Sequence, residues 1–415
     1  MKQNFDITII GGGAAGIMAA ISAKQHHPDA RIVILDQTFA LGRKILVSGS
    51  GRCNLTNSNL KKTPEKYYNC DNINFVKKVF TQFDYLAIVN FFEDELGLDL
   101  AEDKKTKAGK IFPKTNEAKT VVTLLVDYLE RLGVEIILNF KCHDIKQVSN
   151  KNFAIINDKG DEVLSDKIIL ACGGKTYPAL GSDGSGFTLA TALGHYLTPL
   201  IPAAVPLVTK NVLSQEAQGV KLEAQITINK HTETGDILFT KYGLSGSAIL
   251  NISREASTAL NRDHKNQIKA SLNFLIGKNK QEVKKILTQR WKKRPEQTIL
   301  KSLIGLLPER VATGILKICN LGFNENVKDI TSSKVDLLCE SLTNLEIIII
   351  DTRGWNEAEF TAGGINVNEV KLGTLESKII DNLYLCGEML DVDGPIGGYN
   401  LSWAWSSGWT AGKCL

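Results

Sequence analysis

The sequence predicts an α/β fold in which a Rossmann-like dinucleotide-binding domain is built from both ends of the chain and is interrupted by a β-rich insert carrying a small helical lobe. Three observations support this prediction. A strand near the N-terminus runs into the glycine-rich turn 11–16, the composition changes near residue 195, and a late strand ends in Gly387-Glu388. The 415 residues exceed what one simple core holds, so two or three domains are expected.

The first element is an apolar strand at 6–10 followed by Gly11-Gly12-Gly13-Ala14-Ala15-Gly16. In a dinucleotide-binding turn, Gly11 allows the tight bend, Gly13 lets the backbone approach a pyrophosphate, and Gly16 lets the next helix pack close to its strand. The pyrophosphate then lies at the N-terminus of that helix. The alternative interpretation is a glycine turn in an ordinary βαβ unit.

The surroundings of this turn favour a dinucleotide. A helical run follows at 17–24, and a second strand at 31–35 ends at Asp36. This acid lies about 20 residues past the last glycine, where a carboxylate accepts hydrogen bonds from an adenosine ribose. The cofactor-binding positions predicted in this segment are Gly11, Gly13, Ala14, Ala15, Gly16, Asp36 and Gln37.

Composition and charge exclude several classes of protein. Apolar residues make up 43% and charged residues 23% of the chain, and no apolar run is long enough to span a membrane, so we expect a soluble protein without a membrane partner. The eight cysteines include no C-x-x-C pair and no His-rich neighbour, so no metal site is expected. Residues 1–5 are no signal peptide, which favours reduced thiols and a cytoplasmic location. The net charge of +4 neither demands nor excludes a polyanionic partner.

The segment 42–57 has small, basic and amide residues where a surface helix would show apolar periodicity. We interpret it as a ligand-lining loop, because its glycines allow close approach and its basic and amide side chains offer hydrogen bonds; an ordinary surface loop is the alternative. Cys53 is either a reactive thiol or a small packing residue. The predicted cofactor-binding positions here are Gly42, Arg43, Lys44, Ser48, Gly49, Arg52 and Asn54.

The middle of the first domain continues with strands and ends in paired glycines. Two alternating strands are expected at 153–156 and 162–164, and a buried strand at 166–172 leads into Gly173-Gly174. Glycines at the end of such a strand allow the backbone to approach a dinucleotide. The run 181–186 resembles a phosphate loop but follows no strand, so we interpret it as the start of a helix. The predicted cofactor-binding positions are Cys142, Ala171, Gly173 and Gly174.

The insert is recognised by prolines near residue 200 and by the alternation that follows. Strands are expected at 222–228, 236–240 and 247–252, and short helices at 281–291, 299–307 and 309–319. The apolar run 345–350 is expected to be a strand that re-enters toward the first domain. The predicted domains are residues 1–195 and 355–415 for the dinucleotide-binding domain and 196–354 for the insert, with a β-rich part at 196–275 and a helical lobe at 276–345.

A second anchor lies near the C-terminus, where a strand at 382–386 delivers Gly387 and Glu388 and a glycine-rich segment follows. In flavoproteins with two such motifs this element closes over the flavin: the acid binds hydroxyl groups, and the glycine backbone and the next helix face the flavin edge. A charge-rich loop with packing glycines is the alternative. The predicted cofactor-binding positions are Gly387, Glu388, Gly397, Gly398, Tyr399 and Asn400.

Taken together, these motifs resemble the BaiN/RdsA (YhiN-like) family of NAD(P)/FAD-dependent oxidoreductases along the whole chain. The first glycine motif is shared by many flavoproteins, whereas the block 48–57 is specific to this family. The residues that carry the resemblance are 11–16, 42–44, 48–57, 172–178, 361–364, 387–388 and 397–400.

The resemblance implies a two-dinucleotide-binding-type FAD domain with a β-barrel-like insert and a helical lobe. It leaves the substrate open among a conjugated C=C bond in a steroid-like acid, uridine in ribosomal RNA and a small amine. Reducing such a C=C bond takes a hydride from the flavin and a proton from a positioned acid, for which Cys53, Tyr177 and Tyr399 are candidates. The sequence shows no second strand-turn-helix nucleotide motif, so NAD(P)H would dock transiently at the flavin, or another donor would reduce it. A non-catalytic FAD-binding protein is the alternative, although such a protein would hardly need the polar block 48–57.

A basic stretch of the insert indicates what kind of partner the protein binds. Residues 278–301 contain nine Lys or Arg against two Glu, with Arg290-Trp291-Lys292-Lys293-Arg294 at the centre. Basic residues with an aromatic ring are typical of surfaces that bind a phosphate backbone and a stacked base. The stretch therefore indicates a ribosomal RNA surface at Lys278–Lys301, with a solvated helix face as the alternative.

Overall fold

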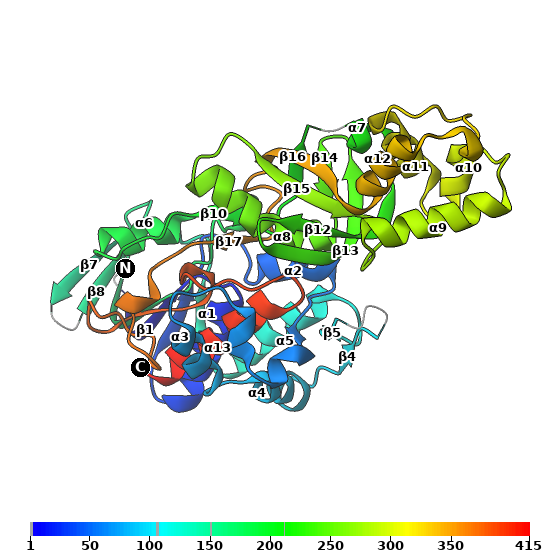
Figure 1. Ribbon diagram of the computed structural model, residues 1–415. Helices are drawn as coiled ribbons and strands as arrows, with labels where there is room; N and C mark the ends of the chain where they lie inside the picture. The colour runs from blue at the N-terminus through cyan, green and yellow to red at the C-terminus, as the bar shows by residue number, and fades with distance from the viewer. Residues whose placement is uncertain (1–2, 105–107, 150–151, 211) are drawn as a thin grey trace. The chain divides into compact units, whose positions relative to one another are not determined.

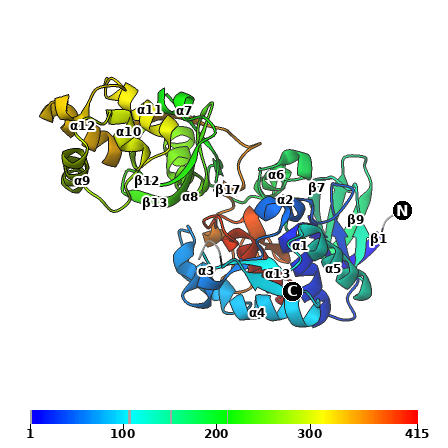
Figure 2. The same ribbon diagram turned by 90° about the vertical axis from the view of Figure 1, so that its right-hand side faces the viewer.

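The computed structural model describes residues 3–104, 108–149, 152–210 and 212–415. The chain divides into two compact units, which are described separately. Unit 1 combines Met1–Leu200 with Phe360–Leu415, and unit 2 is Ile201–Glu359. Both limits of unit 2 thus fall five residues after the expected limits of the insert, 196 and 354. Figure 1 and Figure 2 show the elements of both units.

Unit 1 is built around a seven-stranded sheet with the order β6-β2-β1-β9-β8-β7, in which β18 also pairs with β9. The pairs among β6, β2, β1, β9 and β18 are parallel, and β9-β8 and β8-β7 are antiparallel. The bounds are β1 Gln3–Ile10, β2 Ile32–Leu35, β6 Glu135–Ile137, β7 Cys142–Ser149, β8 Asn152–Asn157, β9 Glu162–Leu170 and β18 Leu383–Leu385.

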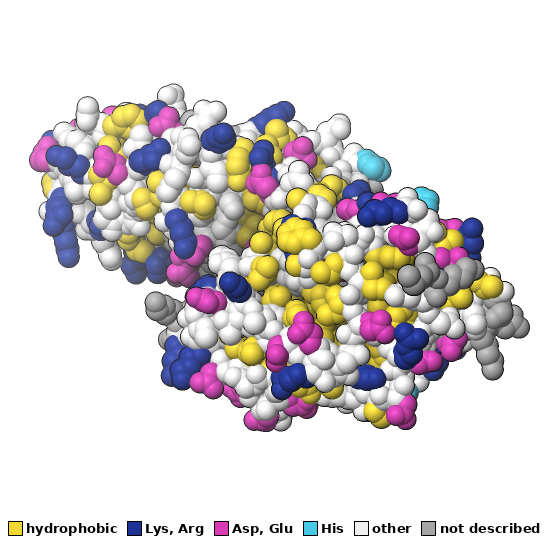
Figure 3. Space-filling model, turned by 180° about the vertical axis from the view of Figure 1, so that it is seen from behind, with side chains coloured by type: hydrophobic (Ala, Val, Ile, Leu, Met, Phe, Trp, Pro, Cys, Tyr) yellow, Lys and Arg dark blue, Asp and Glu magenta, His cyan; other side chains and the backbone are white. Residues whose placement is uncertain are grey.

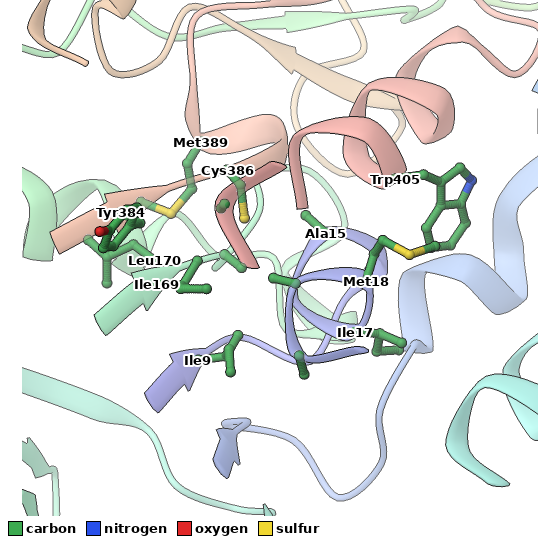
Figure 4. Close-up of a cluster of buried hydrophobic side chains, with 14 of the residues drawn as sticks. Ile9, Ala15, Ile17, Met18, Ile169, Leu170, Tyr384, Cys386, Met389 and Trp405 are labelled. Atoms are coloured by element: carbon green, nitrogen blue, oxygen red, sulfur yellow. The ribbon is translucent and has the colours of Figure 1, made fainter. Parts of the chain in front are cut away.

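The register brings the ends of the parallel strands to one edge. Ile10 lies opposite both Leu35 and Leu170, and Leu385 also lies opposite Leu170. The segments that follow these strands, including the glycine turn after β1, therefore meet at the carboxyl edge of the sheet, where α/β proteins bind ligands. Buried aliphatic residues on the strands beneath this edge, among them Ile9 and Ile169, pack against helix α1, as Figure 4 shows.

Two helices of unit 1, α1 (Ala14–His26) and α13 (Tyr399–Lys413), lie side by side in both ribbon views. Their backbones approach so closely that a Cβ on Gly408 would collide with the carbonyl oxygen of Ala15, and one on Gly412 with that of Ala19. The other helices are α2 Arg43–Gly51, α3 Ile73–Phe80, α4 Tyr85–Asn90, α5 Ala118–Arg131 and α6 Ser185–Ala192; the small strands are β3 Thr56–Asn57, β4 Leu100–Glu102, β5 Lys110–Pro113 and β17 Phe360–Ala362.

Unit 2 contains a closed six-stranded antiparallel barrel with the order β11-β14-β13-β12-β15-β16, which confirms the expected barrel-like insert. Its strands are β11 Leu207–Thr209, β12 Lys221–Ile228, β13 His231–Thr240, β14 Gly243–Ser245, β15 Ile268–Asn273 and β16 Leu345–Thr352, and β10 is Ile201–Ala203. The helices are α7 Val212–Glu216, α8 Ser247–Ser257, α9 Lys280–Lys293, α10 Ile299–Ile304, α11 Glu309–Ile318 and α12 Ser332–Thr343.

The structure corrects four expectations. Residues 247–252 begin helix α8, because Ala248, Ile249 and Ile252 are buried at helical spacing. The run 345–350 belongs to β16, which pairs with β11 and β15 inside the barrel of unit 2 and does not enter the sheet of unit 1. Helix α2 replaces the first part of the expected loop 42–57. Trp291 is buried in the core of unit 2, so its ring is not available to stack on a base.

Candidate functional site

The glycine turn after β1 combines close packing with open space. A Cβ on Gly11, whose φ is +106°, would lie 2.5 Å from the carbonyl oxygen of Ala171, and one on Gly16 would collide with the carbonyl oxygen of Gly11. A Cβ on Gly13 would meet no atom within 4 Å. Gly13 precedes the first turn of α1, which contains no acidic residue. The turn therefore leaves room at a helix N-terminus, where backbone N–H groups and the helix dipole favour an anion.

Asp36 is bound to this turn. Its Oδ2 accepts a hydrogen bond from the N–H of Gly12 (2.7 Å), and its Oδ1 accepts from the N–H (2.7 Å) and the hydroxyl (2.8 Å) of Thr38. A carboxylate has about four acceptor positions, so three internal donors leave room for a further one. Asp36 thus fixes the shape of the turn and still offers an acceptor to a ligand. The neighbouring Gln37 donates to the carbonyl oxygen of Gly181 (2.6 Å).

The segment between β9 and α6 supplies paired glycines and an orphaned hydroxyl. Ser182 is buried, and its Oγ makes no hydrogen bond within the described residues; it lies 3.5 Å from the place of a Cβ on Gly173. A buried hydroxyl without a partner is unfavourable, so a ligand that reaches Ser182 would stabilise it. The sequence analysis missed Ser182, because it assigned 181–186 only to the start of a helix, which the structure places at Ser185.

Glu388 and Lys44 form an ion pair of 2.8 Å that joins α2 to the segment after β18. Lys44 Nζ also donates to the hydroxyl of Thr176 (2.6 Å), and the N–H of Thr361 donates to Glu388 Oε1 (2.8 Å). A Cβ on Gly174 would collide with both Glu388 and Thr361. The pair is therefore also contacted by two further segments of unit 1, one at 174–176 and one at Thr361.

The segment 48–57 holds the C-terminal glycine turn. Asn57 Nδ2 donates to the carbonyl oxygen of Gly397 (2.8 Å). With its amide oriented to satisfy its neighbours, Asn54 Oδ1 accepts from the N–H of Gly398 (3.2 Å). Asn400 bonds the N–H (2.9 Å) and the carbonyl oxygen (2.8 Å) of Gly394, which closes the turn on itself. These amide side chains hydrogen-bond the backbone of the glycine turn and so stabilise its shape, a role that their positions in the sequence did not reveal.

The backbone of 48–53 is irregular. Ser48 leaves the helix of α2 with ψ 146°, Gly49 and Ser50 are left-handed at φ +55° and +60°, and Cys53 has φ +59°. The Ser48 hydroxyl donates to the carbonyl oxygen of Ile45 (2.7 Å). Two guanidinium groups lie over aromatic rings, Arg43 over Phe39 (4.6 Å) and Arg52 over Phe112 (4.4 Å). Gly42, the residue before α2, donates its N–H to the carbonyl oxygen of Gly12 (2.8 Å), which ties α2 to the first turn.

The three candidate proton donors differ in their surroundings. Cys53 is fully buried, and burial raises its pKa to about 12, only partly offset by a hydrogen bond with Ser48. The Tyr399 hydroxyl accepts a hydrogen bond from Asn59 Nδ2 (3.2 Å), and burial raises the pKa of Tyr399. Tyr177 is half-buried in a left-handed conformation at φ +57°.

The remaining predicted positions pack near the strand ends. Ala171 donates its N–H to the carbonyl oxygen of Ile10 (2.9 Å), beside the glycine turn. Cys142 is buried on β7, where burial raises the pKa of its thiol to about 12. A Cβ on Gly387, at φ +73°, would lie 2.7 Å from Cβ of Ala15, so the segment after β18 touches the first turn of α1.

Comparison with known proteins identifies the family. The model of the HI0933-like protein Rossmann domain matches residues 5–414, so the chain belongs to this family. It is 36% identical to a 3-dehydro-bile acid delta(4,6)-reductase of Clostridium scindens, covering 98% of each chain. It is 31% identical to a ribosomal RNA dihydrouridine synthase of Escherichia coli, covering 100% of this chain and 98% of the relative. The fold is similar to that of 3-ketosteroid delta1-dehydrogenase from Sterolibacterium denitrificans, with a TM-score of 0.52, 11% identity and 99% of each chain covered.

These comparisons confirm the resemblance seen in the sequence, and they make the chain a Rossmann-type flavin oxidoreductase. Among the described residues, no helix combines the length and the apolar composition needed to cross a bilayer. The same part of the chain holds no group of three or more His, Cys, Asp or Glu residues arranged to bind a metal ion. All eight cysteines are free thiols.

Proposed function

We propose that unit 1 binds FAD and that the protein reduces a C=C bond conjugated to a carbonyl group. The observation that carries the proposal is the open space at Gly13 before α1, and the orphaned hydroxyl of Ser182, in the segment between β9 and α6, supports it. Both features fit a bound dinucleotide: the helix N-terminus suits a pyrophosphate, and a polar ligand group satisfies a buried hydroxyl. Residues from both chain ends contribute, so the FAD domain needs both.

The two named relatives support the reaction. One reduces a bile acid and the other forms dihydrouridine, and both reactions saturate a C=C bond beside a carbonyl group. Reduced FAD supplies the hydride for such a reaction. The chain contributes the acceptors of Asp36 and Glu388, the dipole of α1 and a proton donor for the second carbon atom. NAD(P)H is proposed as a transient reductant, because the sequence has no second nucleotide motif.

Tyr399 is our proposed proton donor. Its hydroxyl accepts from Asn59, so its own proton is free for another acceptor, and its raised pKa keeps it protonated at neutral pH. Cys53 is fully enclosed, and its thiol would have to move to reach a substrate. Tyr399→Phe should retain FAD and slow the oxidative half-reaction with an enone about 100-fold or more. An unchanged rate would exclude Tyr399 as the donor.

Photoreduction of the FAD-loaded protein followed by an enone or uridine-containing RNA tests the main proposal. Reoxidation of the flavin under anaerobic conditions, with a product that has gained two hydrogen atoms, is the expected result. FAD binding without reoxidation by either acceptor would favour a non-catalytic FAD-binding protein. Purified protein that cannot be loaded with FAD would contradict the proposal itself.

A second proposal concerns the substrate, and exposed cations of unit 2 support it. Lys280 and Lys284 pair with Glu340 (3.1 Å) and Asp336 (2.7 Å). Other basic residues near α9 are exposed and make no ion pair within the described part of the chain: Lys278, Lys285, Lys292, Lys293, Arg294 and Lys301. Figure 3 shows Lys and Arg side chains along one edge of the helical part of unit 2. We propose that these cations bind the phosphates of ribosomal RNA, which would place the protein in the cytoplasm.

Neutralising Lys292, Lys293 and Arg294 together tests the RNA proposal. Binding of RNA releases condensed cations, so each lost phosphate contact should reduce the slope of log affinity against log salt by about 0.7 to 0.9. Flavin content should not change. Identical dihydrouridine levels in ribosomal RNA from cells with and without the protein would contradict the proposal and favour a small enone as substrate.

A further inference from the structure

The Lys44–Glu388 ion pair holds a carboxylate in place by two opposed contacts. Glu388 Oε2 faces Lys44 Nζ at 2.8 Å, and Oε1 accepts the N–H of Thr361 at 2.8 Å. Lys44 is held in turn by the hydroxyl of Thr176 at 2.6 Å. The side chains of the pair are only 27% and 22% exposed, so water screens the pair less than it screens most surface pairs.

Glu388 keeps acceptor positions that Lys44 and Thr361 do not use. A carboxylate has about four acceptor positions, and Lys44 and Thr361 occupy two of those on Glu388. The position of this carboxylate matters: Gly387, the residue before Glu388, lies against Ala15 in the first turn of α1. The remaining acceptors of Glu388 are therefore near the helix N-terminus at which we propose that the FAD pyrophosphate binds.

The role of Lys44 beside the proposed pyrophosphate site depends on its charge and on that of Glu388. A bare carboxylate in a partly buried site next to two phosphates would repel them, whereas a neutral ion pair adds no net charge. We propose that Lys44 is a positioning residue for Glu388: it fixes the carboxylate and cancels its charge, so that Glu388 accepts hydrogen bonds from hydroxyl groups of FAD beside the phosphates. This inference rests on the proposed function, and it assigns to the pair a role that neither residue performs alone.

A double-mutant cycle tests this role by the affinity of the apoprotein for FAD, measured from the quenching of flavin fluorescence. Lys44→Met should weaken binding about tenfold or more, because it leaves an uncompensated charge. Glu388→Gln should weaken binding less, since it removes acceptor strength without adding repulsion. The double variant should bind FAD more tightly than Lys44→Met alone. Lys44→Arg should restore most of the affinity, because a guanidinium also pairs with a carboxylate.

The dependence of FAD affinity on salt concentration distinguishes a positioning role of Lys44 from simple structural support. The loss caused by Lys44→Met should shrink as ionic strength rises, because repulsion between Glu388 and the phosphates is screened. A matched control is Lys371→Met, which removes the ion pair of Lys371 with Glu376 (2.8 Å) in the same unit and should leave FAD affinity within about twofold.

Two outcomes would overturn the inference while the parent protein still binds FAD. One is an unchanged affinity in Lys44→Met, and the other is a double variant weaker than both single variants with a loss that does not depend on salt. Circular dichroism of each apoprotein and the Lys44→Arg variant show whether a loss reflects misfolding. Failure of the parent protein to bind FAD would contradict the proposed function instead.

Discussion

The hydroxyl of Ser377 lies 3.0 Å from Nε2 of His195 in the interior of unit 1. Ser377 Oγ also accepts the N–H groups of Ile379 and Ile380 (both 3.0 Å), so its own proton points to the imidazole. Because Nε2 accepts this proton in a hydrogen bond, the N–H of the His195 ring is at Nδ1, and it donates to Glu369 Oε2 (3.1 Å). This Ser–His–Glu chain joins the segment that leaves unit 1 near residue 195 to the one that returns after residue 360. The buried serine acts here as a structural anchor, since no solvent reaches it.

Replacing His195 should destabilise unit 1. His195→Leu keeps a similar volume but leaves the Ser377 proton without an acceptor and removes one of the two donors to Glu369 Oε2, the other being the N–H of Tyr196 (2.8 Å). This change should lower the free energy of unfolding by about 2 kcal/mol. Urea denaturation followed by fluorescence measures this change in the free energy of unfolding. The matched control is His231→Leu in unit 2, where the histidine side chain is 63% exposed and should contribute within about 0.5 kcal/mol. Equal stabilities of the two variants would contradict the anchoring role.

Gly13→Val should remove FAD without unfolding the protein. Gly13 has φ −84° and ψ −168°, a conformation that valine accepts, and its Cβ would meet no protein atom within 4 Å. The new side chain would therefore fill the space proposed for the pyrophosphate, and the purified variant should be colourless with a normal melting temperature. Gly16→Val is the contrast, because its Cβ would collide with the backbone of Gly11 and should prevent folding. Full flavin content in Gly13→Val would contradict the proposed site.

Gly408→Ala should destabilise the contact between α1 and α13. The added methyl group would collide with the carbonyl oxygen of Ala15, which is backbone and cannot move without shifting the first turn of α1. We expect a loss of about 1 to 3 kcal/mol, as for other overpacked cores, together with weaker FAD binding because α1 carries the glycine turn. Lys413→Ala, at the C-terminal end of α13, is the control and should be close to neutral. An unchanged free energy of unfolding and an unchanged FAD affinity in Gly408→Ala would contradict the close contact between α1 and α13.

Cys53 should be inert in the native protein and should make stability fall at high pH. Its folded pKa is raised to about 12 from 9.0, so between these values the unfolded chain binds fewer protons than the folded one. Stability contributed by the neutral thiol is therefore present below pH 9.0 and is lost as pH rises toward 12. Cys53→Ala should show a shallower loss over this window than the parent, and a thiol reagent at pH 8 should modify Cys53 only after unfolding. Rapid native modification would show that the thiol is accessible.

The sequence alone determined the elements whose signals are local. The strand and glycine turn at 6–16 were visible because a run of buried strand residues and three glycines at fixed spacing leave few other conformations. The same holds for β12, α9 and α11, whose burial follows a clear period of two or of 3.6 residues. The barrel class of the insert came from the resemblance to a known family, and the structure confirmed it.

Tertiary structure decided which of these residues meet. Lys44 and Glu388 are 344 positions apart, and nothing local in either segment specifies that pair. Ser247–Ile252 alternates like a strand, yet it folds as a helix because Gly246, at φ +100°, turns the chain and the barrel buries one helical face. The amides of Asn54 and Asn57 resembled ligand donors, but packing used them to hold Gly397 and Gly398. Local patterns fix the conformation of a segment, whereas the partner of a polar side chain depends on what folding brings within hydrogen-bond distance.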